Sequence, residues 1–176
     1  LDVDGDGIPW RSLPDTGAPA FFTRGSGHNA MAQYTERSDD YVNNLDRLAR
    51  KFDTAKTGVP GPIETGDAGA TVGILAFGST HWAILETRDQ LREEASLPTS
   101  YLRLRAYPFS DAVADFIRRH DRVYVVEQNR DGQMLTLLKM DLDPALLTRL
   151  RSVLHYNGLP IDARSVTSSI LAQEKN

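Results

Sequence analysis

The chain carries a short apolar run, Val72-Gly-Ile-Leu-Ala-Phe77, which is followed directly by Gly78-Ser-Thr80. A run of six residues without a charge is typical of a strand that is buried on both faces of a sheet. Ser79 or Thr80 is a typical helix cap, and Ile84 and Leu91 recur at helical spacing up to about residue 95. This stretch therefore predicts a buried strand that leads into a helix.

The alternation of strand and helix patterns continues to the end of the chain. The predicted strands after the first are Tyr101–Ala106, Arg122–Glu127 and Val153–Tyr156. The first of the following predicted helices begins after the cap Ser110 and ends at His120. The others are Gln133–Lys139, Asp143–Arg149 and a last helix that Asp162 caps. The alternation predicts an α/β fold with three layers, in which helices cover both faces of a mostly parallel sheet.

The first third of the chain has a different pattern. Residues 1–37 are rich in Gly, Pro and Asp and show no period, so they predict loops and turns. Over 38–55, Ser38 is a typical N-cap, and Tyr41, Leu45, Leu48 and Phe52 share one helix face. Residues 57–70 carry several glycines and prolines and few large apolar residues, which predicts a linker.

The composition excludes several classes of protein. The 176 residues include no cysteine, so the chain itself holds no disulfide, thiolate nucleophile or cysteine-bound cluster. The net charge of −4 argues against a strongly basic nucleic-acid-binding protein. No apolar run approaches the length of a membrane span, and no signal peptide is visible. Because the chain starts at Leu1 and enters at once into Asp2-Val-Asp-Gly-Asp-Gly7, we expect a piece of a longer protein.

The segment Asp2-x-Asp4-x-Asp6-Gly7 matches the start of a calcium-binding loop. The twelfth position, where such a loop needs a bidentate Glu, is Leu13, so a polar turn is the favoured interpretation. Gly5-Asp6-Gly7 is also similar to the start of the thiamine diphosphate motif, but its distance to Asn43-Asn44 is too long. A calcium-binding module is kept as an alternative.

Three loops carry candidate residues for anion binding or for an interface. In Arg24-Gly-Ser-Gly-His28, Arg24 and His28 flank a glycine-rich backbone that a ligand can approach, although a solvated surface turn is the favoured interpretation. Ser79 and Thr80 open a helix, where exposed N–H groups bind anions or are simply capped. The polar segment after the strand Arg122–Glu127 lies where parallel sheets carry functional loops. Its candidate residues are Glu127, Asn129 and Arg130.

Seven segments, taken in order, resemble a known family. They are residues 2–14, 22–28, 48–52, 77–80, 104–109, 125–133 and 158–164. Among them are Phe22-Thr-Arg-Gly-Ser-Gly-His28, Leu104-Arg-Ala-Tyr-Pro-Phe109 and Val125-Val-Glu-Gln-Asn-Arg-Asp-Gly-Gln133. Their order and spacing resemble the C-terminal region of the alpha subunit of two-subunit 2-oxoacid:ferredoxin oxidoreductases, most closely the 2-oxoglutarate type.

The resemblance implies two parts and a fifth strand. It implies that residues 1–65 are the tail of a pyrimidine-binding domain with its linker. It further implies that residues 66–176 form a domain similar to the transketolase C-terminal domain, with a five-stranded mixed sheet. The residue patterns alone indicate four of these strands.

The resemblance also implies a function for the whole complex. The complex would oxidatively decarboxylate a 2-oxoacid, pass electrons to ferredoxin and form an acyl-coenzyme A. Thiamine diphosphate, magnesium and the iron–sulfur cluster would belong to the beta subunit, so we expect no cofactor and no catalytic residue here. Arg11, Arg24 and His28 would contact anions near a junction. The partners would be the beta subunit, ferredoxin and coenzyme A, in the cytoplasm, without nucleic acid or membrane. The C-terminal domain of another thiamine diphosphate enzyme is the further alternative.

Overall fold

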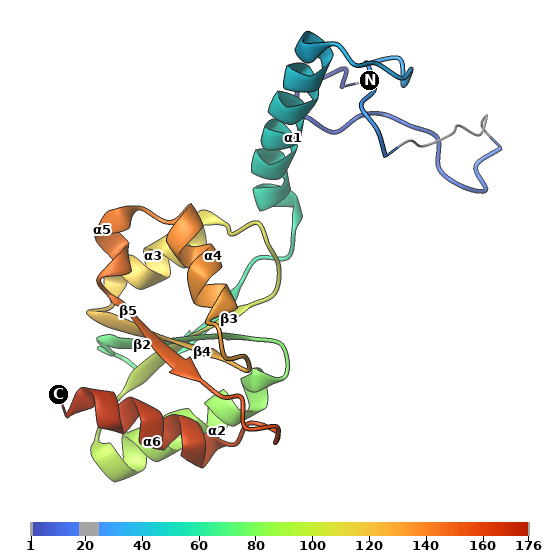
Figure 1. Ribbon diagram of the computed structural model, residues 1–176. Helices are drawn as coiled ribbons and strands as arrows, with labels where there is room; N and C mark the ends of the chain where they lie inside the picture. Colours follow the sequence, from blue (N-terminus) through green and yellow to red (C-terminus); the bar gives the residue numbers. More distant parts are fainter. Residues whose placement is uncertain (1, 18–24, 176) are drawn as a thin grey trace. The chain divides into compact units, whose positions relative to one another are not determined.

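A computed structural model describes residues 2–17 and 25–175 (Figure 1). The chain divides into two compact units, Leu1–Val59 and Pro60–Asn176. The first unit consists of loops and one long helix, whereas the second holds the whole sheet. The two units are described separately below.

The first unit is built on the helix α1, Ser38–Gly58. The helix confirms the one predicted over 38–55 and continues three residues further, to Gly58. The prediction that Ser38 caps it is wrong, because Ser38 is already helical and Arg37 is the residue before it, without a capping side chain. Asp39 and Asp40 occupy the first turn, where carboxylates suit the helix dipole. None of the 21 residues of α1 is buried.

The turn formed by residues 2–8 packs directly against α1. Arg47 donates a hydrogen bond to the carbonyl of Gly7 over 2.9 Å, and the hydroxyl of Thr54 donates to the carbonyl of Asp6 over 2.6 Å. Gly7 is the closest point of approach and has φ +84°. A Cβ atom on Gly7 would lie 2.3 Å from the backbone nitrogen of Lys51. The turn therefore requires glycine at this position for both conformation and space.

Replacing Gly7 by alanine tests this packing, with Gly5→Ala as the matched control. Both glycines have positive φ, +84° and +81°, but a Cβ at Gly5 meets nothing within 4 Å. Gly5→Ala should therefore cost only the left-handed strain of about 1–2 kcal/mol. Gly7→Ala should in addition push the turn off the helix and abolish the amide-exchange protection at Gly5 and Gly7. Equal protection in the two variants would contradict the close packing.

The second unit is a five-stranded mixed sheet in the order β1-β3-β2-β4-β5 (Figure 1). Its strands are β1 Ile63–Gly66, β2 Val72–Phe77, β3 Thr99–Leu104, β4 Arg122–Glu127 and β5 Leu150–Leu154. The pairs β2–β3, β2–β4 and β4–β5 are parallel, and β1 is antiparallel to β3 at one edge. Its helices are α2 Thr80–Ala95, α3 Asp111–Arg119, α4 Gln133–Asp141, α5 Pro144–Leu147 and α6 Ala163–Glu174.

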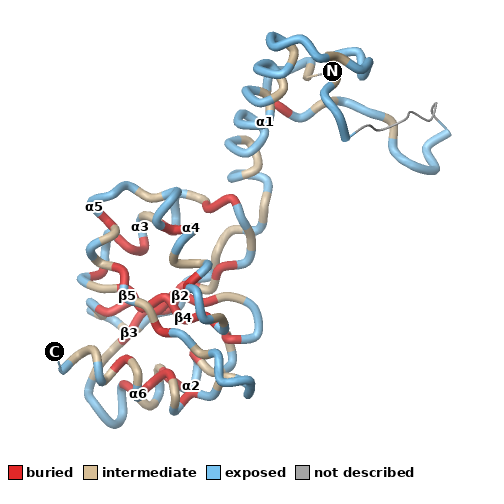
Figure 2. Tube along the Cα trace, viewed as in Figure 1, coloured by how far each residue is buried: buried red, intermediate tan, exposed pale blue. Residues whose placement is uncertain are grey.

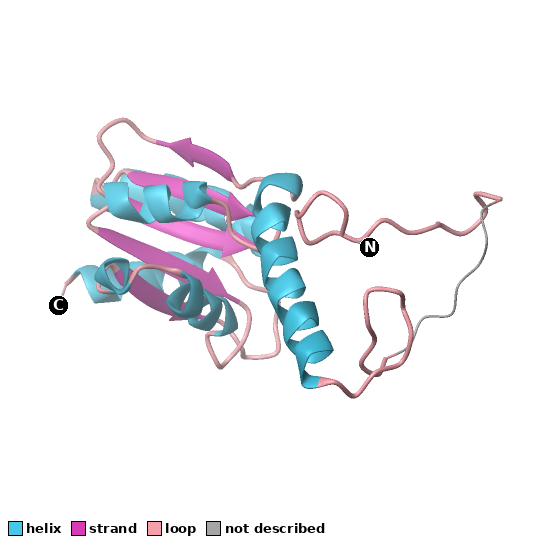
Figure 3. Cartoon of the chain, turned by 90° about the horizontal axis from the view of Figure 1, so that it is seen from above, coloured by secondary structure: helices cyan, strands magenta, loops and turns pink. Residues whose placement is uncertain are grey.

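Helices cover both faces of this sheet, which confirms the predicted three-layer α/β fold (Figure 3). One apolar core lies between the sheet and α3, α4 and α5, and includes Leu75, Phe116 and Val125. The other lies between the sheet and α2 and α6, and includes Ile74 and Val126. The buried residues of this unit concentrate on the strands, as Figure 2 shows in red.

The bounds of several elements differ from the prediction. The stretch 57–70 is not a plain linker, because it contains β1, which is the fifth strand of the sheet. All four residues of β1 are exposed, so no apolar pattern marks the strand. Strands β3 and β5 begin two and three residues earlier than predicted, because Val72 pairs with Thr99 and Val123 with Leu150.

Helix caps also differ in part from the prediction. Asp143 and Asp162 cap their helices as predicted, by accepting hydrogen bonds from Ala145 and Ser165 respectively. Ser110 precedes α3 but makes no capping hydrogen bond, and its hydroxyl is buried without a partner among the described residues. The helix predicted over Asp143–Arg149 is shorter and ends at Leu147.

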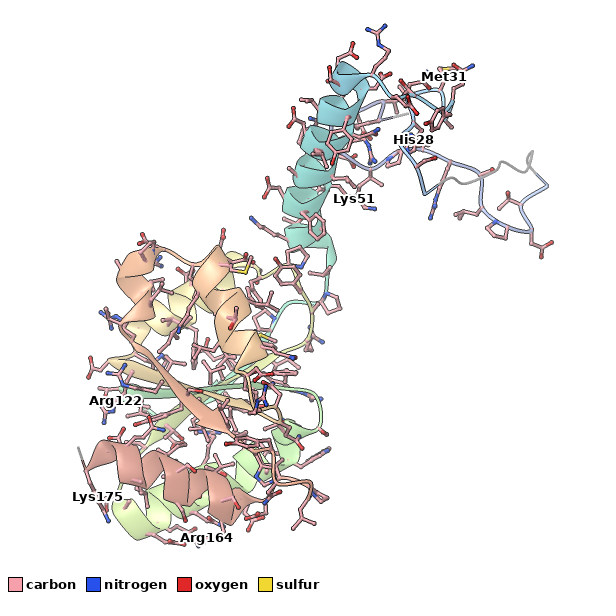
Figure 4. The ribbon with its side chains drawn as sticks, in the orientation of Figure 1. His28, Met31, Lys51, Arg122, Arg164 and Lys175 are labelled. Carbon is pink, nitrogen blue, oxygen red and sulfur yellow. The ribbon has the colours of Figure 1, made fainter. Side chains whose placement is uncertain are left out.

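One partly buried ion pair closes the second unit. Arg122, at the start of β4, pairs with the carboxylate of Glu174 at the end of α6, and the hydroxyl of Tyr124 also donates to this carboxylate (Figure 4 labels Arg122). The hydrogen bond from Arg122 lowers the pKa of Glu174 below its ordinary value of 4.5, although burial opposes the shift. The pair therefore joins the sheet to the last helix while Glu174 is ionised.

The pH dependence of stability tests this pair. Because the pKa of Glu174 is lowered in the folded state, the contribution of the ion pair to the free energy of unfolding is fully present above about pH 4.5. This contribution is lost as the pH falls through the folded-state pKa of Glu174. Glu174→Gln should therefore flatten the acid limb of the unfolding free energy, measured by urea denaturation between pH 2 and 7. Glu94→Gln, which removes a more exposed pair with Arg164, should flatten it less. An unchanged acid limb in Glu174→Gln would contradict this role.

Candidate functional site

The candidate site of the second unit lies at the carboxyl edge of the sheet. The segment Gly78-Ser79-Thr80 follows β2, and Gln128 follows β4, the strand that pairs with β2. The side-chain amide of Gln128 donates to the hydroxyls of Ser79 and Thr80, over 3.3 and 3.0 Å. Thr80 is buried, whereas Ser79 is exposed. The structure thus brings together two of the loops that the sequence singles out.

Glu127, a predicted candidate, is fully buried at the end of β4. Its carboxylate accepts hydrogen bonds from the side chain of Asn129 over 2.8 Å and from the backbone N–H groups of Met134 and Leu135 over 2.8 and 3.1 Å. These two N–H groups belong to the first turn of α4, where a negative charge is favourable. Glu127 therefore has a local role, in which it joins the end of β4 to the start of α4.

The other two candidates of this loop differ in their surroundings. Asn129 also accepts a hydrogen bond from the backbone of Gln133, over 3.2 Å, so it helps to fix the loop. Arg130 is exposed and pairs with the neighbouring Asp131 over 2.7 Å. Of the candidates Glu127, Asn129 and Arg130, only Arg130 presents its charged group to solvent.

A cluster of His81, Tyr101 and Arg103 was not among the candidates from the sequence. Nδ1 of His81 lies 3.2 Å from the hydroxyl of Tyr101, and the two rings are stacked with centroids 5.8 Å apart. Burial and, secondarily, the positive charge of Arg103 lower the pKa of His81. Burial raises the pKa of Tyr101 to about 12. The residues come together because β3 and the start of α2 are neighbours, which no local pattern indicates.

The predicted candidates of the first unit do not form a site among the described residues. Arg11 is exposed, and Arg24 lies outside the described residues. His28 is half-buried, with Nδ1 3.1 Å from the carbonyl of Asn29, and its own carbonyl accepts a hydrogen bond from Asn44 (Figure 4). Over residues 2–17 and 25–175, no hydrogen bond or ion pair joins Arg11 to His28.

The carboxylates of Asp2, Asp4 and Asp6 lie within 4.8 Å of one another. Asp2 accepts hydrogen bonds from the backbone N–H groups of Gly5 and Gly7, over 3.0 and 3.1 Å. Asp6 accepts one from Ile8 over 2.7 Å. These bonds shape the turn that packs on α1, so the acidic pattern has a structural explanation within the chain itself.

Comparison with known proteins gives one curated relative. The chain is 27% identical over 174 residues to the alpha subunit of 2-oxoacid:ferredoxin oxidoreductase 2 from Aeropyrum pernix. The match covers 96% of this chain and 26% of that protein, so the chain spans about a quarter of the relative's length. No family model matches the chain. Within the described residues, no helix has the length and apolarity needed to span a membrane.

Among solved structures, a 2-oxoglutarate:ferredoxin oxidoreductase from Magnetococcus marinus has the same fold. That structure holds 2-oxoglutarate, coenzyme A and succinyl-CoA, and it matches 96% of this chain with a TM-score of 0.78 at 19% identity. The match covers 29% of that chain. The alpha chain of a probable 2-oxoacid ferredoxin oxidoreductase from Thermoplasma acidophilum overlaps only 66% of this chain, with a TM-score of 0.43 at 22% identity and 98% of its own length.

The sequence relative and the shared fold agree with each other. Along nearly all of its length, this chain is therefore similar to the alpha subunit of a 2-oxoacid:ferredoxin oxidoreductase, and the resemblance that the sequence indicates is confirmed.

Proposed function

We propose that this chain is the C-terminal region of the alpha subunit of a cytoplasmic 2-oxoacid:ferredoxin oxidoreductase that acts on 2-oxoglutarate. The observation that carries the proposal is the similarity over 96% of the chain to an alpha subunit of this kind. The choice of 2-oxoglutarate is supported by the Magnetococcus enzyme, which has the same fold and binds that substrate.

The division into two units supports the proposed domain assignment. We assign Leu1–Val59 to the tail of a pyrimidine-binding domain and Pro60–Asn176 to a domain similar to the transketolase C-terminal domain. The boundary expected after residue 65 is moved to precede β1, because β1 pairs with β3 of the second unit. The first described unit, Leu1–Val59, has no buried residue on its helix, whereas Pro60–Asn176 has two apolar cores of its own. A domain tail and a complete domain should differ in this way.

In this proposal the beta subunit holds thiamine diphosphate, magnesium and the iron–sulfur cluster. These groups supply oxidative decarboxylation of the 2-oxoacid and electron transfer to ferredoxin, with coenzyme A as the acyl acceptor. The chain has no cysteine to ligate a cluster. Its Gly5-Asp6-Gly7 segment is engaged with α1 through the carbonyls of Asp6 and Gly7. The residues of this chain therefore fit a role in domain and subunit docking and scaffolding, without reaction chemistry of their own.

The hydrogen bonds at the carboxyl edge support the scaffolding role. The side chain of Gln128 joins the loop after β4 to the start of α2, and Glu127 joins the same strand to α4. Both interactions hold helices on opposite faces of the sheet at fixed positions.

We propose Arg11, Arg24 and His28 as contacts for carboxylate or diphosphate groups at the junction with the rest of the complex. Substitutions there should change the Michaelis constant for the 2-oxoacid or for coenzyme A.

The proposed activity is tested on the full-length alpha subunit expressed together with its partner subunit. With thiamine diphosphate and magnesium present, the complex should reduce viologen or ferredoxin when 2-oxoglutarate and coenzyme A are added. Pyruvate in place of 2-oxoglutarate should give a clearly lower rate. If a complex shown to hold its cofactor and cluster reduces neither acceptor with any 2-oxoacid, the proposal fails and another thiamine diphosphate enzyme becomes the better assignment.

A substitution at Glu127 tests whether the carboxyl edge acts as a scaffold. Glu127→Gln places an amide where the carboxylate accepts three hydrogen bonds, so at least one buried donor loses its acceptor. We expect a loss of about 1–3 kcal/mol in the free energy of unfolding, with the turnover number of the folded complex unchanged.

The matched control is Asp131→Asn, which removes an exposed carboxylate from the same loop. It should change the unfolding free energy by less than about 0.5 kcal/mol. A Glu127→Gln complex that keeps its stability but loses turnover would show that Glu127 takes part in the reaction.

A further inference from the structure

Helix α1 carries a stripe of large apolar side chains that stay largely exposed among the described residues of its unit. Tyr41, Leu45, Leu48 and Phe52, here called the α1 seam, have exposed fractions of 61%, 49%, 37% and 53%. Val42 beside them is 52% exposed. Single exposed apolar residues are ordinary on protein surfaces, but a contiguous row of this kind marks a contact surface.

The α1 seam and the docked turn use different faces of the same helix. The seam residues follow one another at steps of four, three and four, so they lie in one narrow stripe along the axis. The turn of residues 2–8 contacts Arg47, Lys51 and Thr54, which lie about 90° to 150° around the helix from the seam at about 100° per residue. Within residues 2–17 and 25–59, the seam side chains therefore stay 37–61% exposed, whereas the turn already covers another face of the helix.

The exposure of its apolar side chains indicates that α1 needs a further packing surface to be stable. A helix of 21 residues without a buried side chain gains little from propensity alone, since most helical stability in proteins comes from packing of an apolar face. A stripe with four-three-four spacing packs lengthwise against one neighbouring element, as in helix pairs with interdigitating ridges. The face opposite the seam is polar and includes Asn43, Asp46 and Arg50.

We propose that the α1 seam is buried against an apolar surface of the remaining alpha-subunit polypeptide, within the proposed pyrimidine-binding domain. This inference rests on the proposed function. The region that matches this chain makes up only 26% of the curated relative and 29% of the Magnetococcus chain. About three quarters of a chain of that length therefore lies outside the matched region and can provide the surface that covers the seam. The seam itself carries no charge, and the described residues of its unit form no apolar core, as expected of an element taken from the interior of a larger domain.

Hydrogen exchange of α1 tests the proposal directly. The measurement compares peptides spanning 38–58 in the 176-residue chain and in the full-length alpha subunit with its partner subunit. We expect amide exchange in α1 to be at least about 100-fold slower in the full-length protein. If α1 is already protected in the 176-residue chain, or is equally unprotected in both, the proposed occupant is wrong.

A pair of substitutions with the same chemistry locates the contact. Leu45→Glu places a charge in the seam, whereas Asn43→Glu places one on the exposed polar face of the same helix turn. In the full-length alpha subunit, Leu45→Glu should lower the melting temperature and restore fast exchange in α1, and Asn43→Glu should do neither. If Leu45→Glu does not accumulate as folded protein, Leu45→Ala is expected to show the same loss of protection to a smaller degree.

Other outcomes separate this inference from the proposed function. Leu45→Glu and Leu45→Ala variants that behave like Asn43→Glu would overturn the inference. The inference is also overturned if α1 is protected in a dimer of the unsubstituted alpha subunit and Leu45→Glu converts this dimer into a monomer. The occupant of the seam would then be a second copy of the alpha subunit. A complex in which α1 is protected but 2-oxoglutarate is not oxidised would refute the proposed activity and leave the seam assignment intact.

Discussion

The fold of the second unit depends on the burial of β2 and β4 between two apolar cores. Residues of each strand alternate between the two cores, with Leu75 and Val125 on one face and Ile74 and Val126 on the other. Because both faces are covered, the backbone groups of these strands have no water to bond and must pair with their neighbours. The pairing of β2 with both β3 and β4 follows from this constraint. The pairs are parallel because a helix connects each of these strands to the next, and these helices cover the two faces of the sheet.

The same constraint explains why polar side chains gather at the carboxyl edge. Parallel strands end together, so the loops that follow β2 and β4 meet, and Gln128 reaches the hydroxyls of Ser79 and Thr80. Glu127 is the last residue of its strand and is buried, and its carboxylate accepts hydrogen bonds from Asn129 and from two N–H groups of α4. Polar groups that bond to one another in this way hold neighbouring elements in place, which is what the proposed scaffolding role requires.

The two units differ in the source of their stability. The second has its own cores and a closing ion pair between Arg122 and Glu174. The first consists of one helix and a turn that depends on the absence of a side chain at Gly7, and its helix exposes the α1 seam. The proposed burial of the α1 seam against further polypeptide would supply the packing that the described residues of this unit lack.

The sequence by itself determined the elements whose signals are local. The runs Val72–Phe77 and Arg122–Glu127 are strands with the predicted bounds, and the caps at Asp143 and Asp162 form as predicted, because burial periodicity and capping act within a few residues. The order of its motifs also indicated the family. Only the tertiary structure decided the edge strand Ile63–Gly66, which is exposed and exists through its pairing with β3.

The candidate site follows the same division. The positions of Ser79, Thr80 and Glu127 at the ends of strands were predictable, because the sequence marks the apolar strands β2 and β4 clearly. Their bonding was not, since the acceptor role of Glu127 toward α4 and the stacking of His81 on Tyr101 join residues from separate elements. Such contacts are set by how strands align and helices pack, and a linear pattern records only what each residue prefers near its own neighbours in the chain.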